Sequence, residues 1–375
     1  MRKLALFAII VALVIAAFVA WLLLPSFGVP QPRDLGASSD LMELAARLPR
    51  GSEVILLPRA SVDVAALQRN PISRSLLESF GMPPQALWAM RILGDGALAI
   101  APRKDSFSIA TRTGPLRGWV ASALMSTAGF PLRREGGLWI TDSTAPPAEN
   151  AESDRDAMSS ATSGLVGHLF VVVFPSSHND APFAASALLL GSTVQAEGRW
   201  LTEPEGETNA PFRFDHPATA AVSIVSSRTP DLLRQAEPLI PEIRGKLDGG
   251  SLFAIWDVET GGALPRPVGA LVWGSSSEPQ LLGFGGGARR LENDPRIGPR
   301  LPSGEWSLQF DTTRTRRVIH PFVKSRLVRI VASRFHSRVE RLDRWMGSLP
   351  PGSRGSVVAE RQGRLEVWHL WVEAK

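Results

Sequence analysis

Residues 4–24 read LALFAIIVALVIAAFVAWLLL, a run of 21 residues without a charged side chain. At about 1.5 Å rise per residue, a helix of this length roughly matches the hydrocarbon thickness of a bilayer. Arg2 and Lys3 precede the run, whereas the first cation after it is Arg33. This bias predicts a single transmembrane helix whose N-terminus lies in the cytoplasm. We therefore expect a single-pass protein of the inner (cytoplasmic) membrane, with its bulk in the periplasm.

A cleaved signal peptide is the alternative interpretation of this run. Such a peptide has a shorter apolar region, about 7 to 15 residues, followed by a small-x-small cleavage site. The nearest match is Phe18-Val19-Ala20, which begins with a bulky Phe, and apolar sequence continues past it to Leu24. The pattern favours an uncleaved signal anchor.

Composition limits what the rest of the chain can do. With 44% apolar residues, a chain of 375 residues can build about two domain cores beyond the anchor. The absence of cysteine excludes disulfides, a thiol nucleophile and thiolate metal ligands. The six histidines never fall at HxH or HxxxH spacing, so no local metal-binding pair is predicted. We expect no metal site and no other cofactor.

Hydrophobic periodicity and turn residues divide the chain into five parts. They are an anchor at 1–24, a Pro/Gly-containing tether at 25–37, a first α+β module at 38–142, a flexible connector at 143–164, and a second α+β module with insertions at 165–375. Both modules read as strand, helix, strand, strand, helix and a closing hairpin. That order predicts two antiparallel-sheet modules of split β-α-β type, and its recurrence indicates an internal repeat.

The spacing of apolar residues predicts helices in both modules. Leu116, Trp119, Val120, Ala123 and Leu124 have the spacing of one buried helical stripe. A short helix is expected at 183–190. One long helix is expected at 321–346, with Leu327 and Ile330 in its apolar stripe and Gly347 at its end.

The first module opens with Leu48-Pro49-Arg50-Gly51-Ser52 ahead of a strand, and its helix breaks at Asn70-Pro71. With the anchor before it, this layout resembles bacterial membrane-anchored extracytoplasmic proteins classed as domains of unknown function. The resemblance covers most of the chain and implies the anchored topology. It supplies no catalytic residues.

A glycine-rich segment, Gly283-Phe284-Gly285-Gly286-Gly287-Ala288, matches the G-x-G-x-x-A pattern of dinucleotide-binding turns. Its context differs from that of such turns, because we expect no helix after it and because Glu305 opens a strand instead of closing one. We interpret the segment as a glycine-rich turn.

Histidines beside acids are the candidates for hydrolysis. Asp215-His216, or His178 with Asp180, could join one of many serines, but neither G-x-S-x-G nor S-x-x-K is present. A loop histidine beside an aspartate usually makes an ordinary hydrogen bond. We therefore predict no catalytic residues.

Positive charge gathers in the last quarter of the chain, where residues 286–375 hold twice as many basic as acidic side chains. The helix expected at 321–346 carries seven cations against two acids. One interpretation is a solvated surface, because exposed charges mostly interact with water. The other is an anionic partner: a phospholipid head group, an acidic envelope polymer or an acidic protein, with nucleic acid not expected. The contacting residues would be Arg326, Arg329, Arg334, Arg338 and Arg341.

These patterns predict a membrane-anchored extracytoplasmic binding or scaffold protein of the bacterial cell envelope that does not catalyse a reaction. The alternative is a membrane-tethered hydrolase with a dispersed Ser/His/Asp site. The two differ in whether the fold brings a Ser, a His and an Asp within hydrogen-bond reach of one another.

Overall fold

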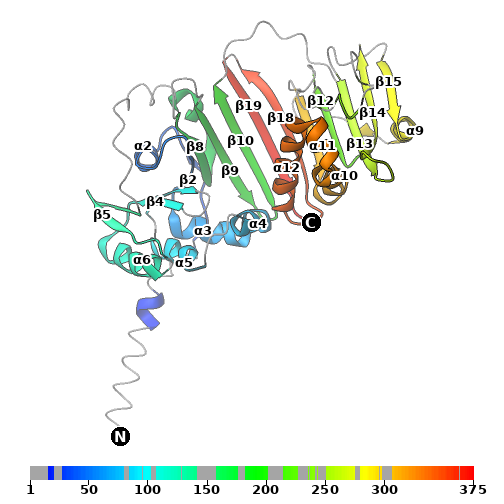
Figure 1. The fold of residues 1–375 in the computed structure, drawn as a ribbon. Helices are drawn as coiled ribbons and strands as arrows, with labels where there is room; N and C mark the ends of the chain where they lie inside the picture. The colour runs from blue at the N-terminus through cyan, green and yellow to red at the C-terminus, as the bar shows by residue number, and fades with distance from the viewer. Residues whose placement is uncertain are drawn as a thin grey trace, which may run out of the picture. The chain divides into compact units, whose positions relative to one another are not determined.

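The structure is a computed structural model. It describes residues 16–20, 28–79, 84–94, 96–102, 107–127, 129–141, 158–175, 182–201, 214–226, 235, 237–240, 243, 251–274, 279–294, 296–297, 306–362 and 364–375. The chain forms two compact units (Figure 1). Unit 1 is Met1–Gly191 with Ala196–Leu201, and unit 2 is Ser192–Gln195 with Thr202–Lys375.

Unit 1 mixes short strands with helices. Its strands are β1 (Arg33–Asp34), β2 (Glu53–Leu57), β3 (Leu98–Pro102), β4 (Phe107–Thr111), β5 (Arg133–Glu135), β6 (Leu138–Ile140), β7 (Val166–Gly167), β8 (Leu169–Val173) and β9 (Phe183–Leu190), and β10 (Thr193–Leu201) has residues in both units. Its helices are α2 (Ser39–Ala45), α3 (Ala60–Arg69), α4 (Pro71–Ser79), α5 (Pro84–Ile92) and α6 (Pro115–Thr127).

Unit 2 has longer strands. They are β11 (His216–Pro217), β12 (Val222–Ser226), β13 (Ser251–Glu259), β14 (Arg266–Gly274), β15 (Pro279–Phe284), β16 (Arg296–Ile297), β17 (Trp306–Asp311), β18 (Arg354–Gln362) and β19 (Leu365–Glu373). Its helices are α9 (Gly287–Glu292), α10 (Thr312–Lys324), α11 (Arg326–Val331) and α12 (Ser333–Gly347).

The prediction of two split β-α-β modules is wrong, because antiparallel β-structure dominates in a different order. Within unit 1, neighbouring strands of the main sheet follow the order β9-β8-β2-β3-β4-β6-β5, and within unit 2 they follow the order β15-β14-β13-β12-β17-β18-β19. In a split β-α-β unit, another strand lies between the two strands that a helix joins. Two helix-joined pairs are instead direct antiparallel neighbours: β2 pairs with β3 across α3 to α5, and β17 pairs with β18 across α10 to α12. Only β4 and β5, which α6 joins, flank another strand of the described sheet, β6.

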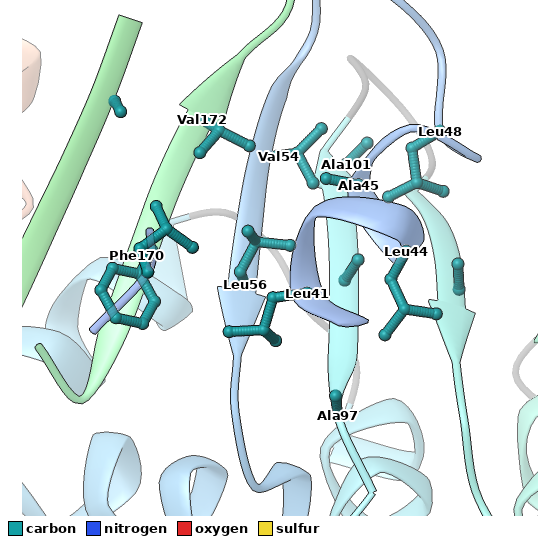
Figure 2. Close-up of a cluster of buried hydrophobic side chains, with 14 of the residues drawn as sticks. Leu41, Leu44, Ala45, Leu48, Val54, Leu56, Ala97, Ala101, Phe170 and Val172 are labelled. Atoms are coloured by element: carbon teal, nitrogen blue, oxygen red, sulfur yellow. The ribbon is translucent and has the colours of Figure 1, made fainter. Parts of the chain in front are cut away.

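The core of unit 1 lies on both faces of its strands. On one face, Leu41 and Leu44 of α2 pack with Val54 and Leu56 of β2 (Figure 2). Leu57, the next residue of β2, packs instead with side chains of α3, α5 and α6. This division follows from the strand geometry, since successive side chains point to opposite faces.

Parts of the predicted tether and connector contribute to this core. Leu35, within residues 25–37, is fully buried, and its N–H donates to the Leu165 carbonyl at 2.9 Å. Just before it, β1 pairs with β7. Residues 143–157 of the predicted connector lie outside the described residues, whereas Met158 and Ala161 near its end are buried.

The segment 183–190, expected as a helix, is strand β9. Its alanines and leucines favour a helix by intrinsic propensity, which is a weak preference. Pairing with β8 over Phe183 to Ala187 and full burial of Ala184 override that preference.

The structure contradicts the predicted transmembrane anchor. Within the described residues, no helix is long and apolar enough to cross a membrane. Of residues 4–24, only 16–20 are described. The other residues of the predicted anchor lie outside the described part, and the single-pass topology, the signal anchor and the inner-membrane location are withdrawn.

The two units share one pairing pattern. β2 is flanked by β3 and β8, as β12 is flanked by β13 and β17. The next pairs are β8 with β9 and β17 with β18. Residues 174–182 join β8 to β9, whereas residues 312–353 join β17 to β18 and contain three helices. The described residues of the β8–β9 connection contain no helix, whereas α10 to α12 lie between β17 and β18.

Candidate functional site

Three helices replace the single helix expected at 321–346. Asp311 caps α10, because its carboxylate accepts a hydrogen bond from the Arg314 N–H at 3.0 Å. Ser325 ends α10 in extended backbone, and its hydroxyl accepts from the Val328 N–H at 3.3 Å, which caps α11. Ala332 then separates α11 from α12. Because the backbone leaves the helical conformation at each break, the next helix starts in a new orientation and a different set of its side chains faces inward.

The inner faces of these helices form one core within unit 2. Its buried members are Ile319 and Phe322 of α10, Val328 of α11 and Val339 of α12. The rings of Phe322 and Phe335 meet edge to face, with their centroids 6.0 Å apart. The buried ring of His336 donates from Nε2 to the Val323 carbonyl at 2.9 Å. These contacts fix α12 against α10. The outer side chains of the three helices therefore project from a packed core.

The outer faces carry the five predicted arginines. Arg334, Arg338 and Arg341 are exposed on α12, and their spacing of four and three places them on one side of the helix. Arg326 and Arg329 are exposed on α11. Within the part of the chain that the structure describes, no ion pair engages Arg326, Arg329, Arg334 or Arg341.

The acids near these helices are engaged elsewhere. Asp343 is 12% exposed at its side chain and lies 3.4 Å from Arg316 Nε and 3.2 Å from His320 Nδ1. Asp257 lies 3.6 Å from Arg317. The remaining acid on α12, Glu340, is half-buried. The α10 cations are thus partly neutralised, while the outer side of α11 and α12 keeps its positive charge.

Sequence reasoning missed the apolar surface of α11. Leu327, Ile330 and Val331 are 43%, 77% and 49% exposed, whereas Val328 is fully buried. The expected buried stripe through Leu327 and Ile330 is wrong, because α11 has only six residues between its two breaks and turns one side chain inward. The signal was Ser325, a good N-cap residue placed directly before an apolar run.

The histidine of the predicted Asp215-His216 pair lies between two serines. His216 is 3% exposed, with Nδ1 2.7 Å from Ser223 Oγ and Nε2 2.8 Å from Ser307 Oγ. Burial lowers the pKa of His216 to about 4, so the ring is neutral at pH 7. Both ring nitrogens are occupied by hydroxyls, so no carboxylate orients this imidazole.

A histidine and an aspartate meet at a different place. His320 Nδ1 lies 3.2 Å from Asp343 Oδ2, on α10 and α12. Among the described residues, no serine hydroxyl is hydrogen-bonded to this histidine. The structure thus separates the Ser–His pair from the His–Asp pair, and the other proposed pair, His178 with Asp180, lies outside the described residues.

The glycine-rich segment 283–288 contains the end of β15, a turn at Gly285 and Gly286, and the start of α9. Gly285 and Gly286 have φ of 56° and 77°, the left-handed region that glycine tolerates. A Cβ at Gly287 would lie 1.8 Å from the Gly269 carbonyl oxygen of β14. The short α9, which we did not expect, begins here, and the glycines permit its close approach to the strand. In the described part of the chain, no group of three His, Asp or Glu side chains could hold a metal ion.

No family model matches the chain, and none of the curated proteins matches it. The fold and the surface define a mainly antiparallel β-sheet protein with an arginine-bearing helical layer in unit 2. The resemblance to anchored extracytoplasmic proteins stays a prediction. The function is therefore inferred from the geometry alone.

Proposed function

We propose that this protein is a non-catalytic binding or scaffold protein whose outer face of α11 and α12 holds a polyanionic partner. We call this face the arginine face and define it by Arg326, Arg329, Arg334, Arg338 and Arg341. The observation that carries the proposal is the exposure of all five side chains on two packed helices.

The charge arrangement supports this proposal. Arginine donates hydrogen bonds in a fixed fork and is weakly hydrated, so it suits carboxylate and phosphate partners. Neighbouring like charges are unfavourable when nothing neutralises them, and an anionic partner would relieve that repulsion. The helices that present the face lie in the connection between β17 and β18, and binding residues often lie on connections between strands.

The hydrolase alternative has weaker support. A triad needs a nucleophile, a base and an orienting acid within hydrogen-bond reach of one another. The buried Ser223–His216–Ser307 arrangement has no acid, and the His320–Asp343 pair has no nucleophile among the described residues. Because burial keeps His216 neutral and inaccessible, we interpret this group as a structural tie between β11, β12 and β17.

Binding of the full chain to inorganic polyphosphate tests the proposal. The variant Arg334→Gln, Arg338→Gln, Arg341→Gln removes three charges from the arginine face. At about 1 kcal/mol per cation, polyphosphate affinity should fall roughly a hundredfold at low salt. The affinity of the parent should also fall steeply as salt is added, since exposed charges are screened.

The matched control is the variant Arg47→Gln, Arg133→Gln, Arg134→Gln, which removes three exposed charges from unit 1. It should bind within a few-fold of the parent, and both variants should unfold at the parent's midpoint within a small margin. If the two triple variants lose affinity equally, net charge rather than the arginine face governs binding and the proposal fails.

A further inference from the structure

The apolar residues of α11 lie among the cations of the arginine face. Leu327, Ile330 and Val331 are all exposed within one six-residue helix, and Ile330 is 77% exposed. Arg326 and Arg329 alternate with them, and Arg334 follows just after the break at Ala332. Single exposed apolar residues are ordinary, but three in one short helix form a contiguous feature.

A soluble polyanion would leave these aliphatic side chains unused, because phosphate and carboxylate groups contact only the guanidinium groups. An interfacial helix uses both kinds of side chain. Its apolar residues enter the boundary between head groups and acyl chains, while its arginines contact anionic head groups. The mixture on α11 fits this second arrangement.

We propose that α11 binds the surface of an anionic lipid bilayer, with Leu327, Ile330 and Val331 inserted and Arg326, Arg329 and Arg334 on the head groups. This inference rests on the proposed function, of which it names the partner class. It requires no membrane-spanning segment, since the helix lies at the interface. A protein with an acidic apolar groove is the competing partner, and the experiment separates the two.

Lipid binding is tested with the full chain and vesicles of equal parts phosphatidylglycerol and phosphatidylcholine. Ile330→Ser with Val331→Ser should lower vesicle affinity at least about tenfold, because each side chain gives up apolar burial. Its control is Val29→Ser with Val166→Ser, whose parent side chains are 77% and 46% exposed against 77% and 49% for the α11 pair. The control should bind vesicles as the parent does.

A label reports insertion without depending on the serine variants. The chain has no cysteine, so Ile330→Cys can carry a single nitrobenzoxadiazole group. Its emission should rise and shift to the blue on anionic vesicles but not on pure phosphatidylcholine. The same label at Val29→Cys should not respond. An unchanged spectrum at position 330 on anionic vesicles would overturn the inference.

Polyphosphate binding distinguishes the two proposals. The serine pair on α11 should leave polyphosphate affinity unchanged, whereas the arginine triple variant should lower both polyphosphate and vesicle affinity. Retained polyphosphate binding with no vesicle binding would refute lipid insertion and leave the arginine face in place, and would favour an acidic protein partner. Equal polyphosphate binding by the arginine triple variant and the parent would refute the proposed function itself.

Discussion

Asp63 is an acid buried in α3 of unit 1. It is 3% exposed, and its Oδ2 accepts a hydrogen bond from the Arg59 N–H at 2.6 Å. Burial raises the pKa of this carboxyl to about 7, although the Arg59 hydrogen bond and the charges of Arg59 and Arg33 act in the opposite direction. The sequence predicts a helix here, but it cannot show that residues 60–67 are all buried. The raised pKa therefore becomes visible only in the packed structure.

Replacing Asp63 should change the pH dependence of stability. The pKa of Asp63 in the folded state is above the unfolded value near 3.8, so the folded state binds the proton more tightly than the unfolded state. The stability that this proton contributes is lost as pH rises from about 4 to about 7. Asp63→Asn should remove this decline. The variant should therefore gain stability relative to the parent across that window, by at most roughly 4 kcal/mol. Urea unfolding at several pH values measures the difference, and Glu135→Gln, an exposed site, should show no such trend.

Single helices show how far local pattern predicts structure. The stripe from Leu116 to Leu124 correctly predicts helix α6, but Leu116 and Trp119 are 55% and 73% exposed. The buried residues are Gly118, Ala121 and Met125. A Cβ at Gly118 would lie 2.2 Å from the ring of Trp139, so the absent side chain allows that ring to approach the helix. A neighbouring strand therefore decides the buried face of α6, as the breaks at Ser325 and Ala332 decide that of α11.

The strand pair β1–β7 provides an element-level prediction. Leu35, directly after β1, is fully buried, whereas Val29 is 77% exposed. Leu35→Ala should destabilise unit 1 by about 2 to 5 kcal/mol, because it removes buried apolar volume. Val29→Ala should cost under about 0.5 kcal/mol. Chemical denaturation followed by circular dichroism compares the two variants, and equal small effects would mean that this segment is only a tether.

Across the whole molecule, the arrangement depends on pairings between distant parts of the chain. β2 pairs with β8 across more than a hundred residues, and β12 pairs with β17 across some eighty residues. Local periodicity predicts strands at these positions, yet it contains no information on which distant strand is the partner. For this reason the order of the sheet was not found from sequence. The cationic residues of the candidate site were found, whereas its apolar component was missed because the breaks at Ser325 and Ala332 change which side chains of α11 are exposed.

Each unit carries a buried titratable group, and the two groups change the stability of their units in opposite directions as pH falls. In unit 2, burial lowers the pKa of His216 to about 4, below its unfolded value near 6.5. The stabilising effect of the neutral ring is present above pH 6.5 and is lost as pH falls toward 4. In unit 1, the stabilising effect of protonated Asp63 increases as pH falls from about 7 toward 4. Acidification should therefore weaken unit 2 and strengthen unit 1 in these two respects.

Hydrogen exchange of the full chain at pH 7 and pH 5, corrected for intrinsic rates, measures this divergence. Amides of β12, β13 and β17 should lose protection at pH 5 relative to those of β2 and α3. His216→Gln should abolish the pH response of the unit 2 strands while leaving that of unit 1 unchanged, and Asp63→Asn should do the reverse. In the His216→Gln variant, Ser223 and Ser307 remain in place to form hydrogen bonds with the glutamine, so the change removes the titrating ring and keeps polar partners for both serines. If His216→Gln leaves the loss of protection in β12 and β17 intact, acids elsewhere control unit 2 and the assignment to His216 is wrong.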